Sequence, residues 1–179
     1  MSKKVLVIST SLRKGSNSET LAKEFSKGAK EAGHHVEILT LWNKKINFCI
    51  GCLACQKTGR CVIDDDANEM IEKMMTAEVI AFATPIYFYE MSGQMKTLLD
   101  RSNPLYPSDY AFRDIYLLAA AAEEEESAMD GAIRGLQGWI ECFDKTNLKG
   151  IVRSNGVTDA GDIAGAPVLN QAYQLGRVL

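Results

Sequence analysis

Five short apolar runs, rich in Val, Ile, Leu and Ala, recur along the chain at intervals that leave room for a helix between them. We expect them to be β-strands at residues 4–9, 36–41, 78–84, 114–121 and 148–154, with Pro85 ending the third. Near-continuous apolar runs are typical of strands that are buried on both faces, and such strands occur in parallel sheets. This pattern therefore constrains the fold more than any other feature of the sequence.

The segments between these runs carry apolar residues at helical spacing. We expect helices at residues 21–32, 67–75, 92–102, 129–143 and 167–179. Strands that alternate with helices predict an α/β parallel sheet with helices on both faces, and five strands in 179 residues fit a flavodoxin-like doubly wound fold. We expect one domain over residues 1–179, with a cysteine-rich insert at about 44–66. Ligands of such sheets bind beyond the carboxyl ends of the strands.

Composition excludes several classes of function. Hydrophobic residues make up 46% of the chain and charged residues 24%, which is typical of a soluble globular protein. The net charge of −3 argues against a nucleic-acid partner, because tracking phosphates requires positive charge. No apolar stretch is long enough for a membrane helix, and the N-terminus lacks the pattern of a signal peptide. We therefore expect a cytoplasmic protein without a membrane partner.

The loop after the first expected strand, residues 9–20, is rich in hydroxyl groups and opens a helix. A helix N-terminus presents unpaired N–H groups and partial positive charge, which suit a phosphate. The alternative is a helix start that is merely capped by Ser or Asn. The loop contains neither G-x-x-x-x-G-K-[ST] nor G-x-G-x-x-G, so a P-loop or a Rossmann dinucleotide site is not supported. We favour a phosphate cradle.

Residues 85–89, Pro-Ile-Tyr-Phe-Tyr, follow the third expected strand. Aromatic side chains at a ligand crevice provide flat apolar walls for a planar ring, although they would also pack against a neighbouring subunit. The small residue Ala119, near the end of the fourth expected strand, would let a ring approach the backbone. The acidic run at 123–126 would lower the reduction potential of a redox-active ring bound nearby, but we favour a solvated acidic helix start.

Four cysteines lie within one short segment in the spacing C-x2-C-x2-C-x5-C, namely Cys49, Cys52, Cys55 and Cys61. Bacterial ferredoxins use a related run to hold a [4Fe–4S] cluster, whereas structural zinc usually takes two separated C-x2-C pairs. The alternative is an insert that is held by packing, with reduced thiols or an adventitious disulfide. Both interpretations stay open. Cys142 stands apart on an expected helix, where we expect a buried core thiol.

Two signatures together resemble one family. Ser9-x-Ser11-x-Arg13-x-x-Ser16-Asn17-Ser18 resembles the FMN-phosphate loop of the NAD(P)H-dependent FMN reductases, and residues 84–87, 92–96 and 100–101 resemble the second signature of that family. The resemblance covers essentially the whole chain. It implies FMN as the cofactor, with a phosphate loop and a ring platform. The implied cofactor-binding residues are Ser9, Ser11, Arg13, Ser16, Asn17, Ser18, Pro85, Ile86, Tyr87, Phe88 and Ala119.

The resemblance implies an FMN-dependent oxidoreductase that passes electrons from NAD(P)H to a small acceptor such as a quinone, a flavin or a nitro compound. The flavin N5 would carry the chemistry, so no catalytic side chain is expected. The cysteine spacing resembles that of the iron–sulfur flavoproteins, which implies, as an alternative, FMN with a [4Fe–4S] cluster and ferredoxin as partner. A further alternative is a non-enzymatic redox carrier or thiol sensor. We expect a homodimer or homotetramer.

Overall fold

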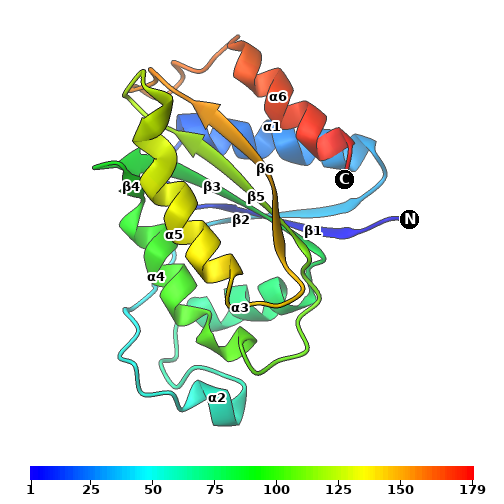
Figure 1. Ribbon diagram of the computed structural model, residues 1–179, viewed down its shortest axis with the longest axis vertical. Helices are drawn as coiled ribbons and strands as arrows, with labels where there is room; N and C mark the ends of the chain where they lie inside the picture. The colour runs from blue at the N-terminus through cyan, green and yellow to red at the C-terminus, as the bar shows by residue number, and fades with distance from the viewer.

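The computed structural model describes residues 1–179 and shows a twisted parallel sheet between two layers of helices (Figure 1). The strand order is β2-β1-β3-β5-β6, and every neighbouring pair on this path is parallel. The strands are β1 (Lys4–Ser9), β2 (His35–Thr40), β3 (Val79–Tyr87), β5 (Asp114–Ala120) and β6 (Asn147–Ser154). The predicted flavodoxin-like doubly wound fold is confirmed, and its five strands lie where the apolar runs placed them.

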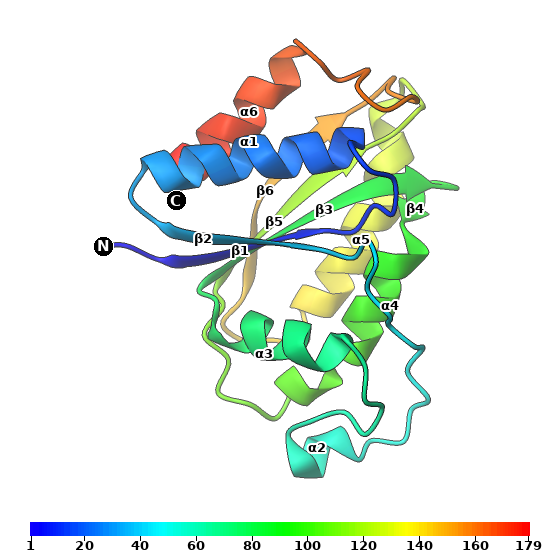
Figure 2. The same cartoon turned by 180° about the vertical axis from the view of Figure 1, so that it is seen from behind.

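Helices cover both faces of this sheet (Figures 1 and 2). One layer contains α1 (Asn17–Glu31) and α6 (Pro167–Arg177), and the other contains α3 (Ala67–Thr76), α4 (Gly93–Arg101) and α5 (Asp130–Ile140). Short elements complete the chain: α2 (Cys55–Thr58), β4 (Glu90–Met91) and the 3-10 turns η1 (Asn103–Leu105) and η2 (Glu126–Met129). Alternate residues of β1 enter separate apolar clusters, so this strand is buried on both faces as its sequence requires.

Helices α1 and α6 cross so closely that their backbones touch. A Cβ atom added to Gly28 would lie 2.0 Å from the carbonyl oxygen of Tyr173, and one added to Gly176 would lie 2.1 Å from that of Phe25. Only glycine leaves room for this approach. The crossing fixes α6, and with it the loop after β6, against α1.

The prediction that Pro85 ends the third strand is wrong, because β3 continues to Tyr87. The pairing of β1 with β3 ends at Ala83. No residue of β1 therefore pairs with Pro85, and the lack of a backbone N–H at Pro85 breaks no hydrogen bond between these two strands. On the other side Pro85 still pairs in register with Ala120. Beyond it, β3 turns back through β4 as an antiparallel hairpin, which the sequence pattern did not indicate.

Two further expectations need correction. The acidic run 123–126 does not start the long helix directly: residues 123–125 form a bend, whose carbonyls at Glu123 and Glu125 accept hydrogen bonds from the loop after β6, and Glu126 begins η2, which leads into α5. Helix α5 begins only at Asp130 and already ends at Ile140. Cys142 therefore lies in the turn beyond α5 and is exposed rather than buried. No helix of the structure combines the length and the apolar character needed to cross a membrane.

Candidate functional site

A cavity of about 200 Å³ lies at the carboxyl ends of the strands, where a doubly wound sheet binds its ligands. We call it the loop cavity. It is formed by the loop after β1, the end of β3, the end of β5 and the loop after β6. Its lining residues are Ser11, Arg13, Ser16, Asn17, Ser18, Pro85, Ile86, Tyr87, Ala120, Ala122, Val157 and Thr158. The structure thus brings together eight of the eleven cofactor-binding residues that the sequence predicts.

The first wall of the loop cavity is the N-terminus of α1. Ser16 is the N-cap, and its hydroxyl accepts a hydrogen bond of 3.2 Å from the backbone N–H of Glu19. The backbone N–H groups of Ser16, Asn17 and Ser18 have no hydrogen-bond partner within the protein. Three unused donors at the positive end of a helix dipole, beside the Arg13 side chain, make this wall suited to an anion.

Two predicted phosphate ligands also tie the loop after β1 to the loop after β6. The Arg13 guanidinium donates from Nη1 to the carbonyl oxygen of Thr158 at 2.8 Å. The Asn17 amide donates to the carbonyl oxygen of Asp159 at 2.9 Å, and its Oδ1 accepts from the N–H groups of Gly161 and Ile163. The Asn17 side chain is therefore used within the protein, and its backbone N–H is the group left for a ligand.

A buried hydroxyl network holds the first loop against the end of β3. Thr10 donates from Oγ1 to the carbonyl oxygen of Ala83 at 3.0 Å and lies 3.1 Å from the Ser92 hydroxyl. The Ser92 N–H donates to Thr84 Oγ1 at 3.1 Å, and the Ser92 hydroxyl caps α4. Sequence reasoning missed this network, although Ser92 carries the usual signal of an N-cap. It fixes the relative positions of two walls of the loop cavity.

Three predicted residues do not line the loop cavity. Ser9 and Ala119 are fully buried within the sheet just before the cavity, and the Ser9 hydroxyl has no hydrogen-bond partner. Phe88 is 99% exposed at the turn between β3 and β4, next to the cavity residue Tyr87. Both turn residues, Phe88 and Tyr89, have left-handed φ angles, of 51° and 64°. Bulky residues rarely adopt such angles, so this protruding aromatic turn (Figures 1 and 2) is strained.

The cysteine segment, residues 44–66, runs from the end of β2 to α3 and extends beyond the helices at the end where α2 lies (Figures 1 and 2). Its four clustered cysteines line a second cavity, of about 340 Å³, which we call the cysteine cavity. The backbone is left-handed at Gly51, Leu53 and Gly59, which turns the chain within the segment that lines this cavity. No three His, Cys, Asp or Glu side chains converge closely enough to hold a single metal ion.

The cysteine segment is fixed to the body of the protein by a buried ion pair. Asp65 accepts two hydrogen bonds from Arg101, at 2.8 and 2.9 Å, and a third from the N–H of Asn47 at 2.8 Å. Burial alone would raise the pKa of Asp65, but the hydrogen bonds from Arg101 and Asn47 hold this pKa well below its usual range. Asp65 is therefore ionised in the folded protein at neutral pH.

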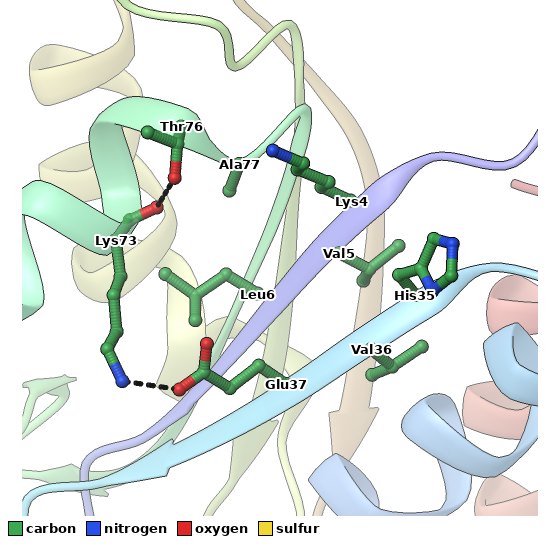
Figure 3. A pocket seen from close by; sticks show the side chains of 9 residues that line it. All are labelled: Lys4, Val5, Leu6, His35, Val36, Glu37, Lys73, Thr76 and Ala77. Carbon is green, nitrogen blue, oxygen red and sulfur yellow. Dashed lines mark hydrogen bonds and ion pairs between the residues drawn. The ribbon is translucent and has the colours of Figure 1, made fainter.

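A third hollow, of about 370 Å³, lies beside the edge strand β2 and below α3 (Figure 3). Lys73 bonds Glu37 across it, which leaves Lys4 as its one lysine without an ion pair. Lys4 and His35 begin their strands, so this hollow is at the amino end of the sheet, opposite the loop cavity. We assign no chemistry to it.

Known proteins resemble this chain over the region that carries the loop cavity and the cysteine segment. A family model described as NADPH-dependent FMN reductase matches residues 3–144, which include both loops and the cysteine segment. The chain is 41% identical over 102 residues to an iron-sulfur flavoprotein of Methanocaldococcus jannaschii, and 31% identical over 138 residues to an iron-sulfur flavoprotein of Methanosarcina thermophila. These matches span 57% and 76% of this chain, and 53% and 72% of the respective relatives.

Solved structures share the fold at low sequence identity. An NAD(P)H:quinone oxidoreductase from Methanothermobacter marburgensis superimposes with a TM-score of 0.73 at 20% identity. The superposition covers 99% of this chain and 98% of the other. At this identity the likeness establishes the fold only.

Proposed function

The chain belongs to the NADPH-dependent FMN reductase family, and we propose that it is an FMN-dependent oxidoreductase that takes electrons from NAD(P)H. The electrons would pass to a small-molecule acceptor such as a quinone, a flavin or a nitro compound. The observation that carries the proposal is the loop cavity, where unpaired N–H donors on α1 face a Pro-Ile-Tyr wall from β3.

The residues present fit the two chemically different ends of FMN. The hydroxyl of Ser11, the free N–H groups of residues 16–18 and the unused N–H groups of Arg13 would hold the phosphate. Ile86 and Tyr87 would cover the ring, and the small Ala120 would leave room for it beside the backbone. When bound, FMN supplies the redox chemistry by accepting a hydride equivalent and releasing electrons singly or in pairs.

The chain itself contributes binding, orientation and exclusion of water. The Thr10–Thr84–Ser92 network keeps the phosphate wall and the ring wall at a fixed separation. Tyr87 is about half exposed at the mouth of the cavity, so its ring would shield one side of the ligand from solvent. No proton-transfer side chain is needed for this role, because the reacting atoms belong to the cofactor.

The variant Ser16→Asp tests the phosphate wall sharply. Asp is as good an N-cap as Ser, so α1 should keep its start, but the new carboxylate would repel a phosphate. We expect FMN affinity to fall at least tenfold, measured by quenching of flavin fluorescence. Affinity for riboflavin, which lacks the phosphate, should stay within about twofold of the unmodified protein.

Ser108→Asp is the matched control, because it adds the same charge just beyond η1, away from the loop cavity. It should leave both affinities unchanged. If Ser16→Asp lost affinity for FMN and riboflavin equally, the substitution would have distorted the cavity, and repulsion between the carboxylate and the phosphate would not explain the loss. Unchanged FMN binding in Ser16→Asp would refute the phosphate assignment.

A second candidate function rests on the cysteine cavity. Because all four clustered cysteines line one space, and two relatives are named iron-sulfur flavoproteins, we propose that these residues hold a [4Fe–4S] cluster. In this form of the proposal, ferredoxin would exchange electrons with the protein. Iron and acid-labile sulfide in anaerobically purified protein test it. Cys52→Ser should lose both, whereas Cys142→Ser, which alters the one cysteine outside the segment, should retain both.

We also propose a homodimer or homotetramer with the aromatic turn of β3–β4 at the contact. Tyr87, Phe88 and Tyr89 are all more than half exposed, which is unusual for three consecutive aromatic residues. Sedimentation velocity of the protein and of a Phe88→Asp variant tests this. A smaller species in the variant is expected, and identical sedimentation would place the contact elsewhere.

A further inference from the structure

Arg101, at the end of α4, is the largest fully buried polar side chain of the protein, with 1% of its surface exposed. Its Nη1 donates to the carbonyl oxygen of Asn47 at 2.8 Å, and its Nη2 donates to that of Ile63 at 3.1 Å. Residues 47 and 63 flank the four clustered cysteines on either side. Together with the bonds to Asp65, these contacts let one guanidinium hold both ends of the loop that carries the thiols.

One donor of this guanidinium is left over. A guanidinium has five N–H groups. The four on Nη1 and Nη2 donate to the Asp65 carboxylate and to the two carbonyl oxygens. The Nε atom is buried and has no hydrogen-bond partner within the protein. Arg101 and Cys61 line the same cavity. A buried, charged donor without an acceptor is uncommon in a native protein and points to a ligand group that it meets.

Charge relations agree with this geometry. The Asp65 carboxylate pairs with the Arg101 guanidinium through two hydrogen bonds of 2.8 and 2.9 Å, and a guanidinium stays charged in proteins. The Asp65 carboxylate bonds the two Nη atoms and leaves the Nε donor unused, and Arg101 lines the cysteine cavity. The guanidinium is therefore oriented, with its anionic partner on one edge and its unused donor on another.

Asn103 supplies a second donor from the turn that follows α4. Its Nδ2 lies 3.1 Å from the Sγ of Cys55, the most buried of the four clustered thiols. It also lines the cysteine cavity. Two side chains outside the cysteine segment, two residues apart in sequence, thus line the cysteine cavity with N–H donors, one on the Sγ of Cys55 and one without a partner.

We propose that Arg101 and Asn103 are positioning residues of the cysteine cavity. Arg101 preorganises the loop from both ends, and the N–H groups of both residues meet the sulfur atoms of an anionic iron–sulfur group held by the four cysteines. This inference rests on the second proposed function. Hydrogen bonds to sulfur favour the more negative, reduced state, so these donors raise the reduction potential of the group.

Asn103→Asp tests the donor role, because it keeps the shape of the side chain and replaces its N–H donor by a carboxylate. We expect full iron content and a midpoint potential lowered by at least 59 mV, a tenfold change in the ratio of reduced to oxidised protein for one electron. Lys57→Gln is the control, since it removes an exposed, unpaired positive charge from the same segment. Its iron content and potential should match those of the unmodified protein.

Arg101→Lys tests the anchoring role, because lysine keeps the charge but cannot bridge two carbonyls and a carboxylate. We expect at least half of the iron to be lost and amide hydrogen exchange over residues 47–63 to be at least tenfold faster, in protein with and without iron.

The outcomes separate the two proposals. If the unmodified protein contains no iron, the cluster function is contradicted, and so is the donor role. Amide hydrogen exchange in metal-free Arg101→Lys then still tests the anchoring role. Iron in the unmodified protein with an unchanged potential in Asn103→Asp overturns the donor role of Asn103 alone. If amide hydrogen exchange over residues 47–63 is as slow in Arg101→Lys as in the unmodified protein, the anchoring role is overturned.

Discussion

Asp65 and Arg101 form an ion pair with an N–O distance of 2.8 Å, and their side chains are 1% and 0% exposed. Asp65 lies at the end of the cysteine segment and Arg101 at the end of α4. The pair therefore joins the least regular part of the chain to a helix that packs on the sheet. Because two charges buried without their partners are costly, this contact makes specific predictions about stability.

Asp65→Asn should destabilise the protein by about 3–5 kcal/mol, because it leaves the Arg101 charge buried and unpaired. Urea unfolding measures the loss. The double variant Asp65→Leu with Arg101→Met should recover part of it, since no charge then remains buried. A loss below about 1 kcal/mol in Asp65→Asn would mean that the pair is open to water in solution.

The same pair predicts how stability depends on acid. The pKa of Asp65 is far lower in the folded protein than its value of about 3.9 in an unfolded chain. Its stabilisation is therefore complete above about pH 5 and is lost as the pH falls toward the folded pKa, because the unfolded chain binds a proton first. Urea midpoints between pH 6 and 3 should fall more steeply for the unmodified protein than for the double variant. Parallel curves would contradict this account.

The crossing of α1 and α6 gives a prediction about packing. Gly28→Ala and Gly176→Ala should each destabilise the protein by about 1–3 kcal/mol or more, because each new Cβ would overlap a backbone carbonyl of the other helix. Gly138→Ala is the control: nothing lies within 4 Å of its Cβ position. That change should stabilise α5 by up to about 1 kcal/mol. Thermal unfolding of the three variants measures these changes in stability. An unchanged stability in Gly28→Ala would show that α1 and α6 lie further apart than the structure has them.

The aromatic turn gives a prediction about strain. Phe88→Gly and Tyr89→Gly should each be more stable than the matching alanine variants by about 1 kcal/mol, because only glycine adopts the left-handed angles without cost. The glycine and alanine variants both lack the aromatic ring, so the difference between them reports only the backbone strain. Urea unfolding of the four variants measures the difference. Alanine variants as stable as the glycine ones would mean that the turn relaxes in solution.

The layout of the fold followed from sequence because its strongest signals are local. Buried strands such as residues 4–9 are apolar throughout, and a parallel sheet in this order places the loops after β1 and β3 side by side. That is why residues as distant as Ser16 and Tyr87 line one cavity, as their separate patterns predicted. The predicted helix starts and ends were less accurate where capping, rather than periodicity, sets the boundary.

What the sequence did not reveal depends on contacts between distant segments. The loop after β6 supplies Val157 and Thr158 to the loop cavity, but only because Arg13 and Asn17 hold it there. Pro85 continues a strand because its neighbour β1 has already ended. Arg101 matched a family signature, yet its bonds to residues 47, 63 and 65 have no local pattern. Such roles follow from tertiary structure alone.

The most direct test of the central claim is to release the cofactor from anaerobically purified protein with acid and to identify and quantify it by chromatography. We predict FMN at about one molecule per chain in the unmodified protein, and a clear loss of it in Ser16→Asp, whose carboxylate would occupy the phosphate wall. Protein that carries no flavin, and that binds neither FMN nor riboflavin when they are added, would contradict the assignment of the loop cavity as a flavin site.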